Sequence, residues 1–271
     1  MKNITKLDIK DFKKSFSKYY PNNTVPNTHF LEWFIGFSEG DGSFIINNSS
    51  KPTCTFVITQ STKDIQVIYY IQNKMGFGNV IKQGNTTSRY IVQKQKDIEI
   101  LINLFNGNLV LPKNFYKYSL WIKCFNNKFK PIIFKNQMII PNFNTYWISG
   151  FTDAEGHFGC SILANSKAYR YRFMLAQKGQ ENIPALASIQ KVLGGKVESH
   201  SIKNVYQLVV NGVSNMKNLI NYFDEHPLFT KKKKSYSLWK DIGNDLFNKK
   251  HLTTSSRKEL KIKTKLINKL K

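Results

Sequence analysis

Two stretches decide the fold of this chain. They are Trp33-Phe34-Ile35-Gly36-Phe37-Ser38-Glu39-Gly40-Asp41-Gly42 and Trp147-Ile148-Ser149-Gly150-Phe151-Thr152-Asp153-Ala154-Glu155-Gly156. Each predicts an apolar helix with small residues that ends in two acids and a glycine. Acids are unfavourable at a helix C-terminus, by about 0.3–1 kcal/mol, because that end carries partial negative charge. A local preference broken twice at matching places indicates a function.

The chain is an internal duplication. The two motif glycines, Gly42 and Gly156, lie 114 positions apart. Further matches follow at a constant separation of 118 positions: Ile71-Gln72 with Ile189-Gln190, Leu101–Phe105 with Leu219–Phe223, and Tyr118–Trp121 with Tyr236–Trp239. Chance does not repeat such matches in register, so we expect two copies of one structural unit.

Composition indicates a folded protein with a polyanionic partner. The 271 residues carry a net charge of +24, which favours nucleic acid over a solubilising surface or a membrane-surface binder. Three scattered cysteines without a Cys-x-x-Cys pair indicate neither a disulfide framework nor a zinc site. No apolar run approaches the roughly 20 residues that span a bilayer, and the first residues lack a targeting pattern. Heavy use of Asn, Lys, Ile, Tyr and Phe is typical of an AT-rich genome and suggests translation inside an organelle, with the mitochondrion favoured over the chloroplast.

Hydrophobic periodicity predicts an α+β fold. Each repeat has the order αββαββα with an antiparallel sheet, and helices are expected near residues 62–74 and 180–193. The predicted organisation has five parts: an N-terminal extension (1–26), a first repeat (27–125), a linker (126–143), a second repeat (144–248) and a Lys-rich helical tail (249–271).

The spacing of small residues predicts how the two motif helices meet. Gly36 with Gly40, and Gly150 with Ala154, lie four apart and share a helix face, which lets two backbones approach closely. Packing these faces together would bring Asp41 and Glu155 side by side. Two such carboxylates suit a divalent cation, which prefers oxygen ligands. Metals held there can activate water for the displacement of a phosphodiester.

The two stretches resemble the paired motifs of LAGLIDADG homing endonucleases, in their single-chain, double-motif branch. The resemblance spans roughly residues 27–248. It implies a monomer whose antiparallel sheets form a DNA-binding saddle, with the motif helices packed at the repeat interface. It also implies cleavage of both strands of a long DNA target with Mg²⁺, for which Mn²⁺ or Ca²⁺ can substitute as a ligand. Double-stranded DNA is the expected partner, with no membrane and no obligate protein partner.

The resemblance assigns roles to individual residues. Asp41 and Glu155 would be the catalytic metal ligands, joined by the backbone carbonyls of Gly40 and Ala154. Gln60 and Gln177 would hold the solvent network around the metals. The basic residues beside the scissile phosphate would be Lys113 and Lys231, with Lys232 as the runner-up to Lys231. Glu39 and Asp153 are expected to be structural, and Trp33 and Trp147 to pack in the core.

One face of each predicted sheet is polar. A two-stranded ribbon fits the major groove, where such side chains read base edges; an ordinary solvated sheet face is the plainer interpretation. The residues expected to contact DNA are Ser43, Ile45, Asn47, Thr53, Thr55, Thr59, Arg89, His157, Ser161, Arg170, Arg172, Lys178 and Lys232. The two faces differ in sequence, so the target should be asymmetric.

Two alternative functions compete with DNA cleavage. An intron RNA-splicing maturase could use the same scaffold to bind its own intron RNA, alone or in addition to cleaving DNA. A sequence-specific DNA-binding regulator lacks a helix-turn-helix signal and has no use for the acids. The intact carboxylates of Asp41 and Glu155 favour cleavage.

Overall fold

The computed structural model describes residues 6–47, 52–164 and 166–269. These residues form two compact units, one of residues 1–141 with 145–154 and one of residues 142–144 with 155–271. The division falls near the end of the second motif helix, whereas the repeat register places that whole helix in the second repeat. Residues 1–5 of the predicted extension and 270–271 of the predicted tail lie outside the described residues.

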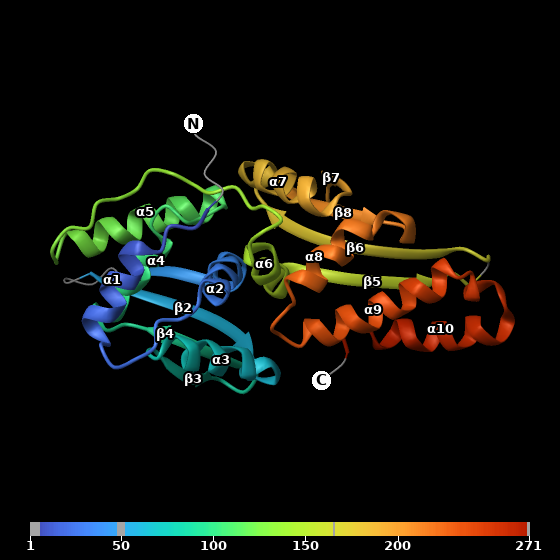
Figure 1. Cartoon of the computed structure of the whole chain (residues 1–271), viewed down its shortest axis with the longest axis horizontal. Helices are drawn as coiled ribbons and strands as arrows, with labels where there is room; N and C mark the ends of the chain where they lie inside the picture. Colours follow the sequence, from blue (N-terminus) through green and yellow to red (C-terminus); the bar gives the residue numbers. More distant parts are fainter. Residues whose placement is uncertain (1–5, 48–51, 165, 270–271) are drawn as a thin grey trace. The chain divides into compact units, whose positions relative to one another are not determined.

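The first unit is a four-stranded antiparallel sheet with helices packed against one face (Figure 1). Its strand order is β1-β2-β4-β3. The elements are α1 (Lys10–Tyr19), α2 (Thr28–Asp41), β1 (Gly42–Asn47), β2 (Thr53–Ser61), η1 (Thr62–Asp64), α3 (Ile65–Met75), β3 (Asn79–Gln83), β4 (Thr87–Val92), α4 (Gln95–Phe105), α5 (Pro112–Asn126) and α6 (Trp147–Glu155).

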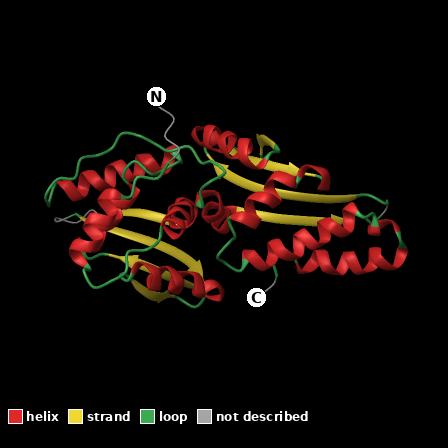
Figure 2. Ribbon diagram, viewed as in Figure 1, coloured by secondary structure: helices red, strands yellow, loops and turns green. Residues whose placement is uncertain are grey.

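The second unit repeats this arrangement with strand order β5-β6-β8-β7 (Figure 2). Its elements are β5 (Gly156–Ile162), β6 (Tyr169–Lys178), η2 (Gln180–Asn182), α7 (Ile183–Leu193), β7 (Lys196–Ser199), β8 (Val205–Asn211), η3 (Val213–Asn215), α8 (Lys217–Glu225), α9 (Lys232–Phe247), η4 (Lys250–Leu252) and α10 (Thr254–Leu266). The predicted α+β class and the antiparallel sheets are confirmed. Each repeat ends in two helices, and the helix expected after the second strand begins as a 3-10 turn.

The motif helix α2 is buried on nearly every side. The side chain of Asn27 caps its first turn by accepting a hydrogen bond from the backbone N–H of Phe30 at 2.8 Å. From Phe30 to Glu39 every residue is buried. A helix that is apolar all round must lie inside the protein, and α2 does. Within the described residues, no helix combines the length and the apolar character that crossing a bilayer requires.

The duplication is visible in the packing of the two cores. Each core centres on one phenylalanine of the sheet's first strand, Phe44 or Phe158, whose ring lies 5.2 or 5.3 Å from that of a tryptophan, Trp121 or Trp239. The remaining members of each cluster also correspond, and they are Phe56, Phe105 and Tyr118 in the first unit and Phe173, Phe223 and Tyr236 in the second. The sequence repeat therefore preserves a packing arrangement.

The two cores differ at one matched position. In the second unit Tyr171 stacks on Trp239 with ring centroids 4.2 Å apart, and its hydroxyl donates to the Trp239 carbonyl at 2.8 Å. Room for this ring comes from Gly243, because a Cβ there would meet the Tyr171 oxygen. Cys54 is the counterpart of Tyr171 in the first unit, and its thiol lies 3.5 Å from the carbonyl of Trp121.

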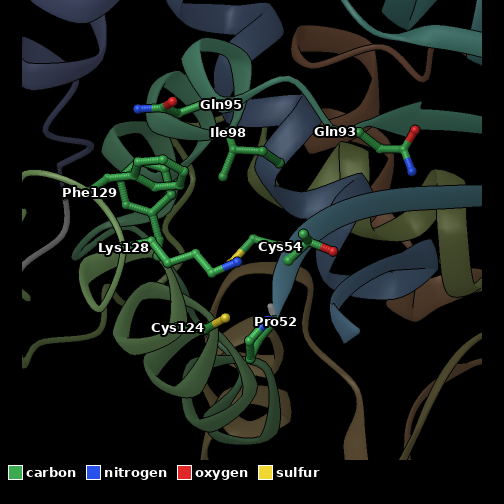
Figure 3. Close-up of a pocket in the computed structure, with 10 residues that line it drawn as sticks. Pro52, Cys54, Gln93, Gln95, Ile98, Cys124, Lys128 and Phe129 are labelled. Carbon is green, nitrogen blue, oxygen red and sulfur yellow. The ribbon is translucent and has the colours of Figure 1, made fainter. Parts of the chain in front are cut away.

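A cavity of about 80 Å³ lies beside Cys54 in the first unit. Figure 3 shows Cys54, Cys124, Lys128 and Phe129 around it. Burial and the neighbouring Cys124 thiol raise the pKa of Cys54 to about 12. A thiol with so high a pKa stays protonated and unreactive at neutral pH. The Cys54 thiol is therefore a packing group at the wall of the cavity and not a nucleophile.

Candidate active site and nucleic-acid interface

Helices α2 and α6 touch backbone to backbone at two glycines. A Cβ added to Gly36 would lie 2.1 Å from the carbonyl oxygen of Trp147, and one added to Gly150 would lie 1.9 Å from the carbonyl oxygen of Trp33. Cβ atoms essentially never approach other atoms within 3.0 Å, so any larger residue would force the helices apart. The close packing expected from the spacing of the small residues is confirmed at Gly36 and Gly150.

Each motif helix also donates a hydrogen bond to an acid of the other. The indole Nε1 of Trp33 donates to Oδ2 of Asp153 at 2.8 Å, and that of Trp147 donates to Oε2 of Glu39 at 2.8 Å. All four side chains are buried. The expectation that these acids are structural is consistent with this pairing, but the pairing itself was missed. Its signal in the sequence is the equal six-residue spacing from each Trp to its own helix's acid.

Glu39 also forms hydrogen bonds with residues at the start of helix α5. Its carboxylate accepts the backbone N–H of Leu111 at 2.7 Å and that of Val110 at 3.0 Å, and the side-chain amide of Asn114 donates to its carbonyl at 2.6 Å. Burial raises the pKa of Glu39 to about 8, against the lowering effect of these hydrogen bonds and of the Trp147 indole. Lys113 stands in the turn that Glu39 anchors, and its side chain is exposed.

Asp41 is the last residue of α2 and is half-buried. The side-chain amide of Gln60, near the end of β2, donates to Oδ2 of Asp41 at 2.5 Å. The structure thus brings together the two residues expected to act at the first half of the site. A carboxylate oriented by an amide suits a hard divalent cation, which takes oxygen ligands.

The corresponding residues of the second repeat occupy matching elements. Glu155 is the last residue of α6, and Gln177 lies near the end of β6, where its amide donates to the carbonyl of Ala176 at 2.9 Å. Lys231 immediately precedes α9 and is exposed, as Lys113 is near the start of α5. Both lysines therefore stand at the N-terminus of equivalent helices.

The polar face of the first sheet carries seven of the thirteen residues expected to contact DNA. Ser43, Asn47, Thr53 and Thr59 are exposed, while Ile45 and Arg89 are half-buried. The Nε of Arg89 is buried and has no hydrogen-bond partner among the described residues, which leaves a donor unsatisfied on this face.

Thr55 differs from that expectation. Its side chain is only 6% exposed. The residue is short and lies in the interior strand β2, directly opposite the longer Ile45. It therefore does not present its hydroxyl at the surface as the strand alternation predicted.

The polar face of the second sheet is more basic. His157, Ser161, Arg170 and Lys178 are exposed, and Arg172 is half-buried with its Nε donating to Asn211 Oδ1 at 3.2 Å. Partial burial and the positive charge of Lys232 lower the pKa of His157. Lys232 therefore lies near this face, although it belongs to helix α9.

The sequence profile of the LAGLIDADG endonucleases matches residues 34–125 and again residues 148–243. The chain belongs to this family. Both matched segments contain one motif helix, one sheet and the helices that cover it.

Curated proteins resemble this chain in sequence, and a solved structure resembles it in fold. Probable intron-encoded endonuclease 4 of Neurospora crassa is 39% identical over 82% of this chain, which spans only 41% of that protein's length. The intron-encoded RNA maturase bI4 of Saccharomyces cerevisiae is 29% identical over 57% of this chain and 22% of its own length. The solved structure of I-SmaMI bound to uncleaved DNA target in the presence of calcium ions superposes with a TM-score of 0.73, at 19% identity, over 88% of this chain and 98% of that chain.

Proposed function

We propose that this chain is a homing endonuclease that hydrolyses both strands of a long, asymmetric DNA target at one site. The observation that carries the proposal is the backbone contact of α2 and α6 at Gly36 and Gly150, because it joins two helices that each end in a carboxylate. The net charge of +24 and the two polar sheet faces support a DNA partner. The intron-encoded relative in Neurospora crassa supports the homing role.

Asp41 and Glu155 would hold divalent cations, for which Mg²⁺ is our choice, together with the carbonyls of Gly40 and Ala154. Among the described residues no three His, Cys, Asp or Glu side chains gather at one point. The pair of carboxylates of Asp41 and Glu155 fits Mg²⁺, which binds one or two carboxylates and completes its shell with water and substrate phosphate. When bound, the metal lowers the pKa of water and stabilises the leaving oxygen of the displacement.

The chain's own residues would position the reaction. Gln60 fixes the orientation of the Asp41 carboxylate through its hydrogen bond, and Gln177 would act likewise in the second half. Lys113 and Lys231, at the starts of α5 and α9, would stabilise negative charge on the phosphates being cleaved. Among the basic residues beside α9, Lys232 would contact the DNA backbone near His157.

The polar sheet faces would read the target. Arg89 on the first face, and Arg170 and Arg172 on the second, would supply guanidinium groups that pair with guanine edges. The first face offers hydroxyls and an amide where the second offers arginines, which supports an asymmetric target.

The test uses double-stranded DNA selected from a random library by binding in Ca²⁺, then incubated with Mg²⁺ or with EDTA. We expect cutting of both strands with Mg²⁺ and none with EDTA. Asp41→Asn and Glu155→Gln should each lower the cleavage rate by about 100-fold or more, as loss of a group that stabilises the transition state does. Both variants should retain binding.

Glu259→Gln is the matched control, because it removes an exposed carboxylate whose partner is Lys263 on the same helix. It should cut like the unaltered chain. Cutting in EDTA, or full activity of either catalytic variant, would refute the mechanism.

A maturase activity is the second candidate, favoured by the likeness to the yeast RNA maturase. It predicts that the chain binds its own intron RNA and that the double variant of Asp41 and Glu155 still promotes splicing. We also propose that the chain acts in the organelle where it is translated, most simply the mitochondrion, because an intron-encoded relative and the AT-rich composition both fit such a genome.

A further inference from the structure

A short turn joins β5 to β6, and two residues expected to contact DNA lie on the strands next to it. Ser161 and Arg170 face each other across the two strands, one rung before the turn, on the polar face of the sheet. The backbone N–H of Leu163 donates to the carbonyl of Ala168 at 3.1 Å and closes the hairpin. The position of this turn therefore sets where Ser161 and Arg170 point.

Arg257, near the N-terminus of α10, donates hydrogen bonds to the backbone of the β5–β6 turn. Its Nη2 donates to the carbonyl of Leu163 at 2.5 Å and to the carbonyl of Ser166, and its Nη1 donates to the carbonyl of His251 at 3.1 Å. One guanidinium thus joins both sides of the turn to the C-terminal segment. The planar, five-donor fork of arginine suits three converging carbonyls, which the ammonium group of lysine cannot match in geometry.

Two further contacts fasten the same hairpin to the C-terminal segment. The ring of His251, only 9% exposed, packs edge-on against Tyr169 at the start of β6, with centroids 4.8 Å apart. The side-chain amide of Asn268 donates to the carbonyl of Phe158 in β5 at 2.8 Å. Figure 1 shows the end of β5 and the start of β6 beside the segment that leads into α10.

We propose that Arg257 is a positioning residue for target recognition, which orders the β5–β6 turn and thereby sets the reading of one end of the DNA target by Ser161 and Arg170. The inference rests on the proposed function, because it gives the Lys-rich tail outside the repeat a role in that same DNA interface. Arg257 acts through backbone carbonyls, so its guanidinium is engaged in the protein and is not a simple phosphate contact.

The experiment compares Arg257→Met with Lys258→Met. Both variants remove one positive charge from the same turn of α10, but Lys258 is exposed at the surface, while Arg257 grips the hairpin. Hydrogen exchange of the free proteins measures protection of the amides from Leu163 to Arg170. Selection from a random double-stranded DNA library in Ca²⁺ measures base preference along the whole target.

Arg257→Met should speed exchange at these amides by about tenfold or more, because the turn opens locally. It should lower discrimination at one end of the target by about tenfold, the size of one good base contact, and leave the other end unchanged. Lys258→Met should change neither measurement, apart from a weaker binding that is uniform across sequences.

Equal protection in the two methionine variants would overturn the proposal, as would equal loss of discrimination at both ends. Arg257→Lys distinguishes geometry from charge, and it should resemble Arg257→Met. If the unaltered chain selects no DNA sequence, the proposed function fails on its own account, and hydrogen exchange then decides whether Arg257 orders the turn.

Discussion

Gly36→Ala probes the contact on which the site depends. The added Cβ would lie 2.1 Å from the Trp147 carbonyl oxygen, so the two helices must separate by roughly 1 Å. Overpacking of this kind costs about 1–3 kcal/mol, and the better helix propensity of Ala offsets about 1 kcal/mol of it. The net loss of stability is then at most about 2 kcal/mol, or about 4–8 °C in Tm. Catalytic groups misplaced by about 1 Å lose about 100-fold in rate.

Cleavage should therefore fall far more than stability. The assay measures the single-turnover cleavage rate at saturating protein, beside thermal unfolding. Gly159→Ala is the control for stability, because its Cβ would meet its nearest neighbour, the ring of His157, at an ordinary 3.4 Å, and it should keep the Tm. If Gly36→Ala cut within about threefold of the unaltered chain with the same Tm, helices α2 and α6 could not be packed as described.

Four further outcomes follow from the same structure. Trp147→Phe should lower the free energy of unfolding by about 1–3 kcal/mol, because buried Glu39 loses a donor; chemical denaturation measures this, and no change would contradict the hydrogen bond. Burial and Arg257 lower the pKa of His251 below its ordinary 6.5, so the unfolded chain binds the proton more tightly and stability should fall as pH drops below about 6.5. His251→Phe should flatten that fall in Tm, and an unchanged slope would exclude the linkage. Cys54→Leu should fill the cavity and raise stability by about 0.5–2 kcal/mol, whereas a lower Tm would show that the cavity cannot accept the side chain. DNA affinity should drop by about 10³–10⁵ between 50 and 200 mM salt; a flat salt profile would argue against phosphate contacts.

The sequence predicted much of the fold because duplication and strand alternation are local or periodic signals. The motif helices, the antiparallel sheets and the close approach of the helices at Gly36 and Gly150 agree with expectation. The same alternation erred at Thr55, since it reports which face a side chain takes and not how far its neighbours cover it.

Other features were beyond sequence reasoning because they join distant residues through backbone groups. The bond from Leu111 to Glu39 spans 72 positions and uses a backbone N–H, which every residue except proline has. The grip of Arg257 on Leu163 and Ser166 is similar, since carbonyl acceptors leave no mark on the residue type. Where two side chains form the bond, as for Trp33 and Asp153, the sequence does contain a signal, namely the equal six-residue spacing from tryptophan to acid in both motif helices.

The exchange of hydrogen bonds between Trp33 and Asp153 and between Trp147 and Glu39 makes the contact self-complementary. Each motif helix carries one donor and one acceptor at the same spacing, so a protein with a single repeat could form the same contact with an identical copy, as isologous dimers do. Joining two copies in one chain keeps that contact at fixed stoichiometry. It also allows the sequence of each half to diverge independently of the other. The unequal sheet faces, and Cys54 in one core where the other has Tyr171, show that each half has changed alone. The paired tryptophans and acids are the part in which neither half can change without the other.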